Sequence, residues 1–102
     1  MTRRGGDPVP LGEALRRFLD RARLTERVEE ARAVPEWAER VGPAIAAVAT
    51  PLRASRGVLV VAVRSSAWLM ELKLREPELL ERINAGRERG RIRKIRFVLE
   101  GP

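Results

Sequence analysis

The sequence predicts a single α+β domain in which a small three-stranded sheet packs on helices, in the order α-α-β-β-α-α-β. Two observations predict this class. Apolar residues recur at helical spacing through the first half of the chain, and after Pro51 they form strand-like runs separated by short helical segments. The chain has 102 residues, enough for one domain with a modest core. Residues 1–9 lack periodicity, so we expect a disordered tail followed by one domain over residues 10–102.

The first predicted helix begins at Pro10, a residue that suits the first turn of a helix. Its apolar positions share one face, which we expect to pack against the core, and its charged positions share the other. The apolar positions are Leu11, Leu15, Phe18, Leu19 and Ala22.

A second helix is predicted to follow, because the hydroxyl of Thr25 can cap it. Its inward-facing residues are expected to be Val28, Ala31 and Val34. Pro35 then restarts the helix, and the apolar stripe continues from Trp37 until Gly42 and Pro43 bend or break it.

A β-hairpin is predicted next, from a short strand over residues 52–54, a turn at residues 55–57 and a strong strand, Val58–Val63. Both faces of the second strand are apolar, so both need cover. A small sheet leaves one face open to a partner or to a second copy of the chain, which makes a homodimer one candidate assembly. The alternative is that the N-terminal helix lies across that face.

Two short helices and a last strand complete the predicted domain. Ser65 or Ser66 caps the first of these helices, Pro77 opens the second, and Gly86 ends it. The last strand covers residues 92–99. Its charged face carries Lys94 and Arg96, and its apolar face carries Ile95, Phe97 and Leu99.

Catalysis and metal binding have few side chains to use in this sequence. It contains no cysteine and no histidine, so the usual ligand sets for zinc, iron and copper and the commonest general base are absent. The loop at residues 86–90 is too short for a phosphate-binding loop and lacks its lysine. We therefore expect a non-enzymatic protein that carries no cofactor and no metal.

Positive charge is concentrated near the carboxyl end. The chain has a net charge of +7, and residues 87–96 hold six cations and one acid. Guanidinium groups bind phosphate in a forked geometry, which favours a polyanionic partner. The alternative is a solvated loop and edge strand whose charges only discourage edge-to-edge pairing. The predicted nucleic-acid-binding residues are Arg87, Arg89, Arg91, Arg93, Lys94 and Arg96, extended by Arg56 in the hairpin turn and Arg64 at the strand end.

The longest stretch without a charge, residues 41–52, is far shorter than the roughly 20 apolar residues needed to span a bilayer. The N-terminal residues lack the apolar segment of a secretory signal. The sequence therefore predicts a cytoplasmic protein with no membrane partner.

An ordered set of motifs covers most of the chain. They are the run at residues 37–46 that begins with Trp37, then Thr50-Pro51-Leu52, the valine-rich residues 57–63, Ser65-Ser66-Ala67-Trp68, and the closing residues 92–97. This set resembles the DciA family of bacterial proteins. The resemblance implies a K-homology-like fold and an adaptor that helps to load or operate the replicative hexameric helicase. It also implies binding to single-stranded DNA, with double-stranded DNA as a second candidate.

K-homology folds commonly grip a single strand with a Gly-x-x-Gly loop between two successive helices. The matching junction here, residues 73–77, has no glycine, so any nucleic-acid contact must use other surfaces. We expect Trp68 and Lys73 to be partner contacts, with core packing as the alternative for Trp68. The remaining aromatic residues are predicted to lie in the core; they are Phe18, Trp37 and Phe97.

Two other functions stay open at this point. One is a stand-alone K-homology-type module that binds RNA or DNA without a helicase partner. The other is a structural or dimerisation module in which the basic strand is incidental. A complex with the cognate helicase would separate the adaptor from both.

Overall fold

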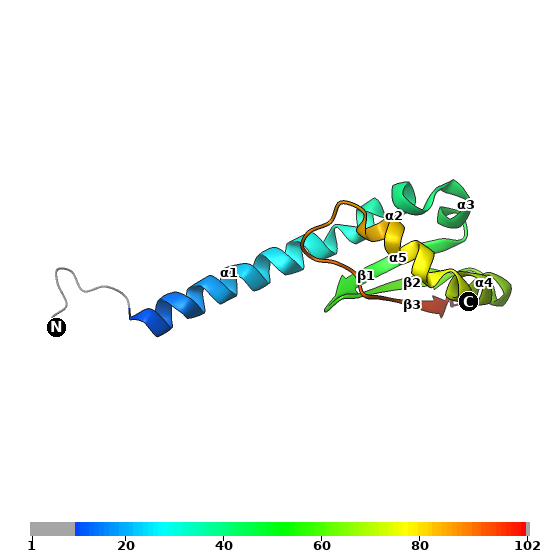
Figure 1. Ribbon diagram of the computed structural model, residues 1–102. Helices are drawn as coiled ribbons and strands as arrows, with labels where there is room; N and C mark the ends of the chain where they lie inside the picture. The colour runs from blue at the N-terminus through cyan, green and yellow to red at the C-terminus, as the bar shows by residue number, and fades with distance from the viewer. Residues whose placement is uncertain (1–9, 102) are drawn as a thin grey trace, which may run out of the picture.

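The computed structural model describes residues 10–101 and has the predicted α+β architecture (Figure 1). The predicted order of helices and strands is confirmed, with one additional short helix, α3. The expected disordered tail at residues 1–9 lies outside the described residues. The elements are α1 (Leu11–Ala31), α2 (Ala33–Val41), α3 (Pro43–Ala46), β1 (Ala49–Ser55), β2 (Val58–Val63), α4 (Ser66–Leu74), α5 (Glu76–Asn84) and β3 (Lys94–Leu99).

The three strands form one sheet in the order β1-β2-β3. β1 and β2 make an antiparallel hairpin, with a bulge between Pro51 and Arg53 that breaks the register. β3 returns through α4 and α5 and pairs parallel with β2. β2 is therefore the central strand, which explains why its sequence is apolar on both faces.

One face of the sheet carries the core. Leu59, Val61 and Val63 of β2 are fully buried there, beside Ile95 and Phe97 of β3. The helices α2 to α5 cover this face, and their largest buried apolar side chains are Trp37, Val41, Ile45, Leu72, Leu79 and Ile83. The predicted core positions of Trp37 and Phe97 are confirmed, and the indole Nε1 of Trp37 donates to the carbonyl of Ala49 at 3.0 Å.

The opposite face of the sheet has no helix over it in the described part of the chain. Its central residues are Val58, Val60 and Ala62, and Val60 pairs in register with Arg53 on one side and Arg96 on the other. Val60 is nevertheless only 7% exposed. The long side chains that flank it are suited to cover apolar surface while their charged heads stay in water.

Helix α1 differs from the prediction. It is one continuous helix of 21 residues that projects from the rest of the molecule, and it does not lie across the open sheet face (Figure 1). No new helix begins at Thr25; its hydroxyl donates instead to the carbonyl of Arg21 at 3.0 Å. The predicted core position of Phe18 is wrong, because this side chain is 58% exposed. The inward orientation of Val28 and Ala31 is wrong as well, since both are exposed.

Two side chains organise the second half of the domain. Of the two predicted capping residues, Ser65 caps α4, because its Oγ accepts from the backbone N–H of Trp68 at 3.2 Å. Asn84, at the end of α5, makes two bonds of 2.8 Å to the backbone N–H and carbonyl of Ile92. These bonds fix the loop between α5 and β3, which carries four of the eight predicted nucleic-acid-binding residues. Within residues 10–101, no helix is long and apolar enough to cross a membrane.

Candidate nucleic-acid interface

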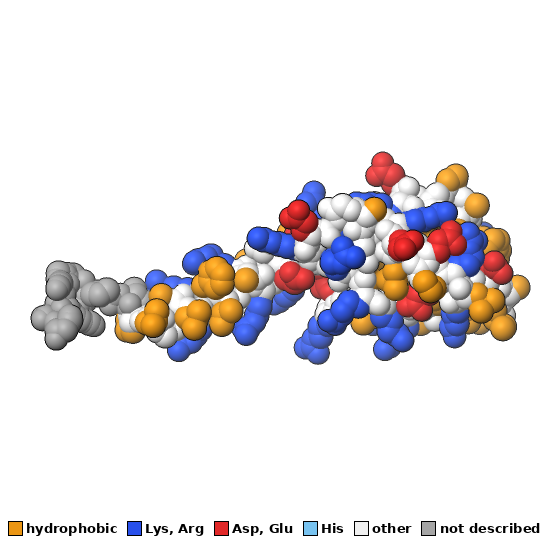
Figure 2. All heavy atoms as spheres, viewed as in Figure 1, with side chains coloured by type: hydrophobic (Ala, Val, Ile, Leu, Met, Phe, Trp, Pro, Cys, Tyr) orange, Lys and Arg blue, Asp and Glu red, His pale blue; other side chains and the backbone are white. Residues whose placement is uncertain are grey.

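A cleft of about 830 Å³ opens where α1 meets the body of the molecule. Its walls are the second half of α1, the hairpin turn between β1 and β2, and the loop that leads into β3. Figure 2 shows basic side chains projecting from this junction. We call this feature the arginine cleft, after the five arginines that line it: Arg23, Arg27, Arg56, Arg91 and Arg93.

The hairpin turn places two of these arginines. Arg56 and Gly57 have φ values of +52° and +80°, the backbone form that a two-residue hairpin turn requires. Arg93 donates from Nη2 to the carbonyl of Arg56 at 2.9 Å, and its guanidinium packs directly over Gly57. A Cβ at position 57 would lie 2.6 Å from Nε of Arg93, so glycine provides the space that this side chain occupies.

Two carboxylates of α1 close the base of the cleft. Glu30 is buried and accepts a hydrogen bond from the backbone N–H of Gly57, and Glu26 accepts one from the backbone N–H of Gly90 at 3.0 Å. Gly90 approaches so closely that a Cβ there would overlap the backbone nitrogen of Glu30. These contacts hold the last turns of α1 against the hairpin and the loop.

The guanidinium groups of the cleft are largely free of acidic partners. Arg23 lies 3.5 Å from Asp20 in an exposed pair. The ion pairs found within residues 10–101 include none that involves Arg27, Arg56, Arg91 or Arg93. Both glutamates of the cleft are engaged by backbone N–H groups, so five cations face two acids and the cleft remains electropositive.

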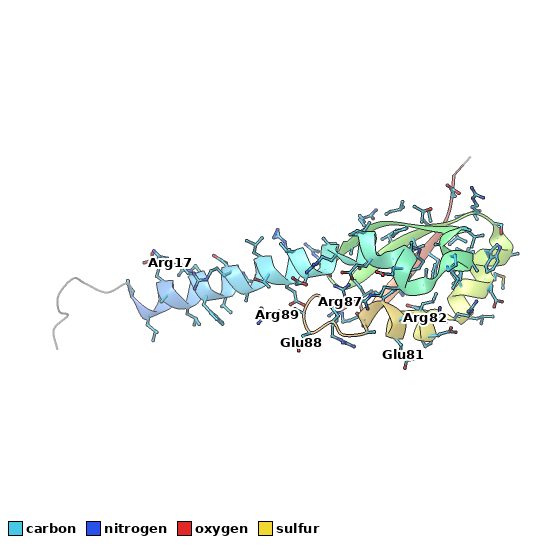
Figure 3. The ribbon with its side chains drawn as sticks, turned by 90° about the horizontal axis from the view of Figure 1, so that it is seen from above. Arg17, Glu81, Arg82, Arg87, Glu88 and Arg89 are labelled. Carbon is cyan, nitrogen blue, oxygen red and sulfur yellow. The ribbon has the colours of Figure 1, made fainter. Side chains whose placement is uncertain are left out.

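Arg87 has a different position from the other predicted residues. It is only 8% exposed, donates to the carbonyl of Glu29 at 2.6 Å, and pairs with Glu36 at 2.5 Å. In Figure 3, Glu88 and Arg89 project from the loop beside it. Arg87 therefore ties the loop to α1 and α2, and its guanidinium is not part of the exposed basic surface.

The remaining predicted cations fall on other surfaces. Arg89 is exposed and lines a separate, smaller hollow with Glu29 and Glu88. Lys94 and Arg96 lie on the open face of the sheet. Arg64 follows the far end of β2, away from the hairpin turn. The structure thus brings together Arg56, Arg91 and Arg93 and separates the others.

The predicted partner contacts lie on α4. Trp68 is partly buried and packs against the core from the first turn of the helix. Lys73 is exposed in the last turn.

Sequence reasoning missed Arg23 and Arg27 in the cleft, and also Arg53 on the open sheet face. Arg23 and Arg27 share one face of α1 with Glu26 and Glu30, a mostly charged face that predicts exposure to solvent. The available signal was this spacing, with acids and arginines at i, i+3 and i+4. It does not distinguish a solvated face from one that contacts backbone N–H groups.

A protein-family model described as "Dna[CI] antecedent, DciA" matches residues 10–97. Similar proteins include one named UPF0232 protein from Mycobacterium ulcerans, at 32% identity over 92 residues, and two with the same name from Mycobacterium bovis and Mycobacterium tuberculosis, at 33%. Each alignment covers 90% of this chain and 49% of the relative. The chain therefore spans about half the length of the curated relatives that it matches.

Proposed function

The chain belongs to the DciA family, whose members have a helicase-loader-type role, and from this we propose that it is an adaptor that binds the replicative hexameric helicase and nucleic acid. The adaptor performs no reaction of its own. The sequence offers no cysteine or histidine for catalysis, so its action on the helicase comes from binding one state of the ring more tightly than another. We place the protein in the cytoplasm, where chromosome replication takes place.

Nucleic-acid binding is supported by the exposed cations. The arginine cleft is one such surface, and Lys94 and Arg96 with Arg53 on the open sheet face form another that includes no acidic residue among its strand positions. The residues that line the cleft include no aromatic side chain on which bases could stack. We therefore expect contact with phosphates, weak dependence on base sequence and strong dependence on salt.

The observation that carries this proposal is the match to the family over residues 10–97. The direct test is gel filtration of this protein with the cognate replicative helicase at low salt, with an unrelated hexameric ATPase as the control. Co-elution with the helicase alone is the expected result. If no complex forms at low salt, the adaptor function is wrong.

A second candidate function is a K-homology-type module that binds RNA or DNA without a helicase partner, and the arginine cleft is the observation that favours it. This candidate predicts nucleic-acid binding together with no helicase complex in the same experiment. A homodimer through the open sheet face is tested by the mass of the protein in light scattering, where a monomer would exclude it.

A further inference from the structure

We propose that the arginine cleft holds the sugar-phosphate backbone of a single nucleic-acid strand, and that Arg23 and Arg27 of α1 form its second wall. This inference rests on the nucleic-acid binding proposed above and assigns it a place and a ligand. It also assigns α1 a part in binding, although the basic segment of the sequence, residues 87–96, lies near the other end of the chain.

The first support is charge. Five guanidinium groups line the cleft and two carboxylates lie at its base, both of them bonded to backbone N–H groups. A phosphate that enters this space meets forked donors on both walls, with Arg23 and Arg27 on one and Arg56, Arg91 and Arg93 on the other.

The second support is rigidity. Glu26 and Glu30 attach α1 to the loop and to the hairpin turn, so the two walls are held at a fixed separation before any ligand arrives. Arg91 and Arg93 are themselves held, because each donates to a backbone carbonyl at 2.9 Å. Groups that are already ordered lose less conformational entropy when they bind, which favours the ligand that fits the existing shape.

The third support is size. A volume of about 830 Å³ lies within the range of pockets that enclose ligands of drug size. This space suits a few linked nucleotides of one strand and is too small to enclose a duplex. With no aromatic side chain among its lining residues, the cleft contacts the backbone and leaves the bases outside.

An anionic membrane surface is the competing class of ligand, because α1 is an amphipathic helix with five arginines and exposed apolar side chains, although five acids in the same helix balance its charge. The cleft favours nucleic acid. Arg23 and Arg27 face a concave space bounded by the hairpin, whereas a membrane would meet the exposed apolar side chains near the other end of α1.

The test compares two double variants of the full chain. R23A/R27A removes two cations of the cleft, and R16A/R21A removes two cations from the same helix that do not line it. Binding of a labelled single-stranded oligonucleotide of mixed sequence is measured by fluorescence anisotropy over a range of salt concentrations. Circular dichroism checks that both variants keep the helix, as expected for alanine on an exposed helix surface.

We expect R23A/R27A to bind the oligonucleotide about 25-fold more weakly at about 0.1 M salt, since each phosphate contact contributes about 0.7 to the dependence of log K on log salt. The salt slope should fall by about 1.4, whereas R16A/R21A should keep a slope near that of the unaltered protein. The helicase complex should form with both variants.

Equal loss of oligonucleotide binding in the two variants would mean diffuse attraction and would overturn the inference. Unchanged binding by R23A/R27A would also overturn it. The same holds if the R23A/R27A substitutions weaken binding of a duplex as much as binding of the single strand. Loss of binding to anionic vesicles, with oligonucleotide binding kept, would assign the cleft to membranes instead. If the unaltered protein binds no oligonucleotide at all, the nucleic-acid part of the proposed function fails, and this inference fails with it.

Discussion

The body of the molecule and the projecting helix α1 place their apolar residues in opposite environments. In the body, Trp37 is 2% exposed and Leu59 and Leu72 are fully buried. On α1, Leu11 is 83% exposed and Phe18 is 58% exposed, and the contacts that attach the helix to the body are polar. Apolar periodicity therefore identified the helix correctly in both regions, but it did not indicate which helix is buried.

The largest expected effect is on the free energy of unfolding, when one aromatic side chain in each region is replaced by alanine. Trp37→Ala should reduce the free energy of unfolding by about 3–5 kcal/mol, because it leaves a cavity in the core and removes the bond to Ala49. Phe18→Ala should change it by less than about 0.5 kcal/mol, because the ring is mostly in solvent. Denaturant unfolding measures both. A large loss for Phe18→Ala would show that the exposed stripe of α1 is covered in solution.

The next effect concerns the junction between the regions. Gly90→Ala should cost about 2–4 kcal/mol, because it combines a left-handed backbone with overlap against Glu30 of α1. Gly86→Ala is the matched control. Gly86 also has a positive φ but has open space around it, so its cost should stay near about 1–2 kcal/mol. Thermal unfolding compares the two, and equal losses would contradict the close contact between α1 and the loop.

A smaller effect tests the carboxylate that holds α1. Glu30→Leu should reduce the free energy of unfolding by about 1–3 kcal/mol, because the buried N–H of Gly57 loses its acceptor. Hydrogen exchange at the amide of Gly57 should become faster. Glu29→Leu serves as the control, since the Glu29 carboxylate makes only a partly exposed pair with Arg32. If Glu29→Leu destabilises the protein as much, the attachment of α1 does not depend on this bond.

The smallest effect lies far from the junction. Arg17→Ala removes an ion pair of 3.0 Å with Glu13 near the free end of α1. The expected loss is about 0.3 kcal/mol or less, because both side chains are exposed and alanine favours the helix. Circular dichroism during thermal unfolding is the measurement, and a loss above about 1 kcal/mol would show that this end of α1 has further contacts.

The fold was predictable where local patterns and burial agree. The valine-rich residues predicted a buried strand, the serine pair at residues 65 and 66 predicted a helix cap, and the alternation of residues 94–97 predicted a strand with one buried face. The structure contains all three features. The direction of α1 was not predictable. Its apolar stripe has the spacing of a core helix, and no local rule states that polar contacts attach it to the body, among them two carboxylates bonded to backbone N–H groups and a backbone carbonyl bonded to Arg87.

The candidate site was predictable only in part for a related reason. Arginines close together in sequence share a surface only if their side chains point the same way. Arg87 turns inward to Glu36, and Arg96 lies on the open face of the sheet. The cleft depends on the meeting of residues far apart in the chain, such as Arg27 with Arg93, and a single sequence does not contain that information.

The parallel pairing of β2 with β3 has a consequence for the kinetics of assembly. The β1–β2 hairpin can close quickly, since hairpins form in roughly 1–10 μs. The pairing of Val58 with Lys94 must wait until α4 and α5 have brought distant parts of the chain together, and such non-local contacts slow folding. The arginine cleft takes walls from early and late parts of the sequence, so we expect it to become complete only in the final step of folding, when β3 joins the sheet.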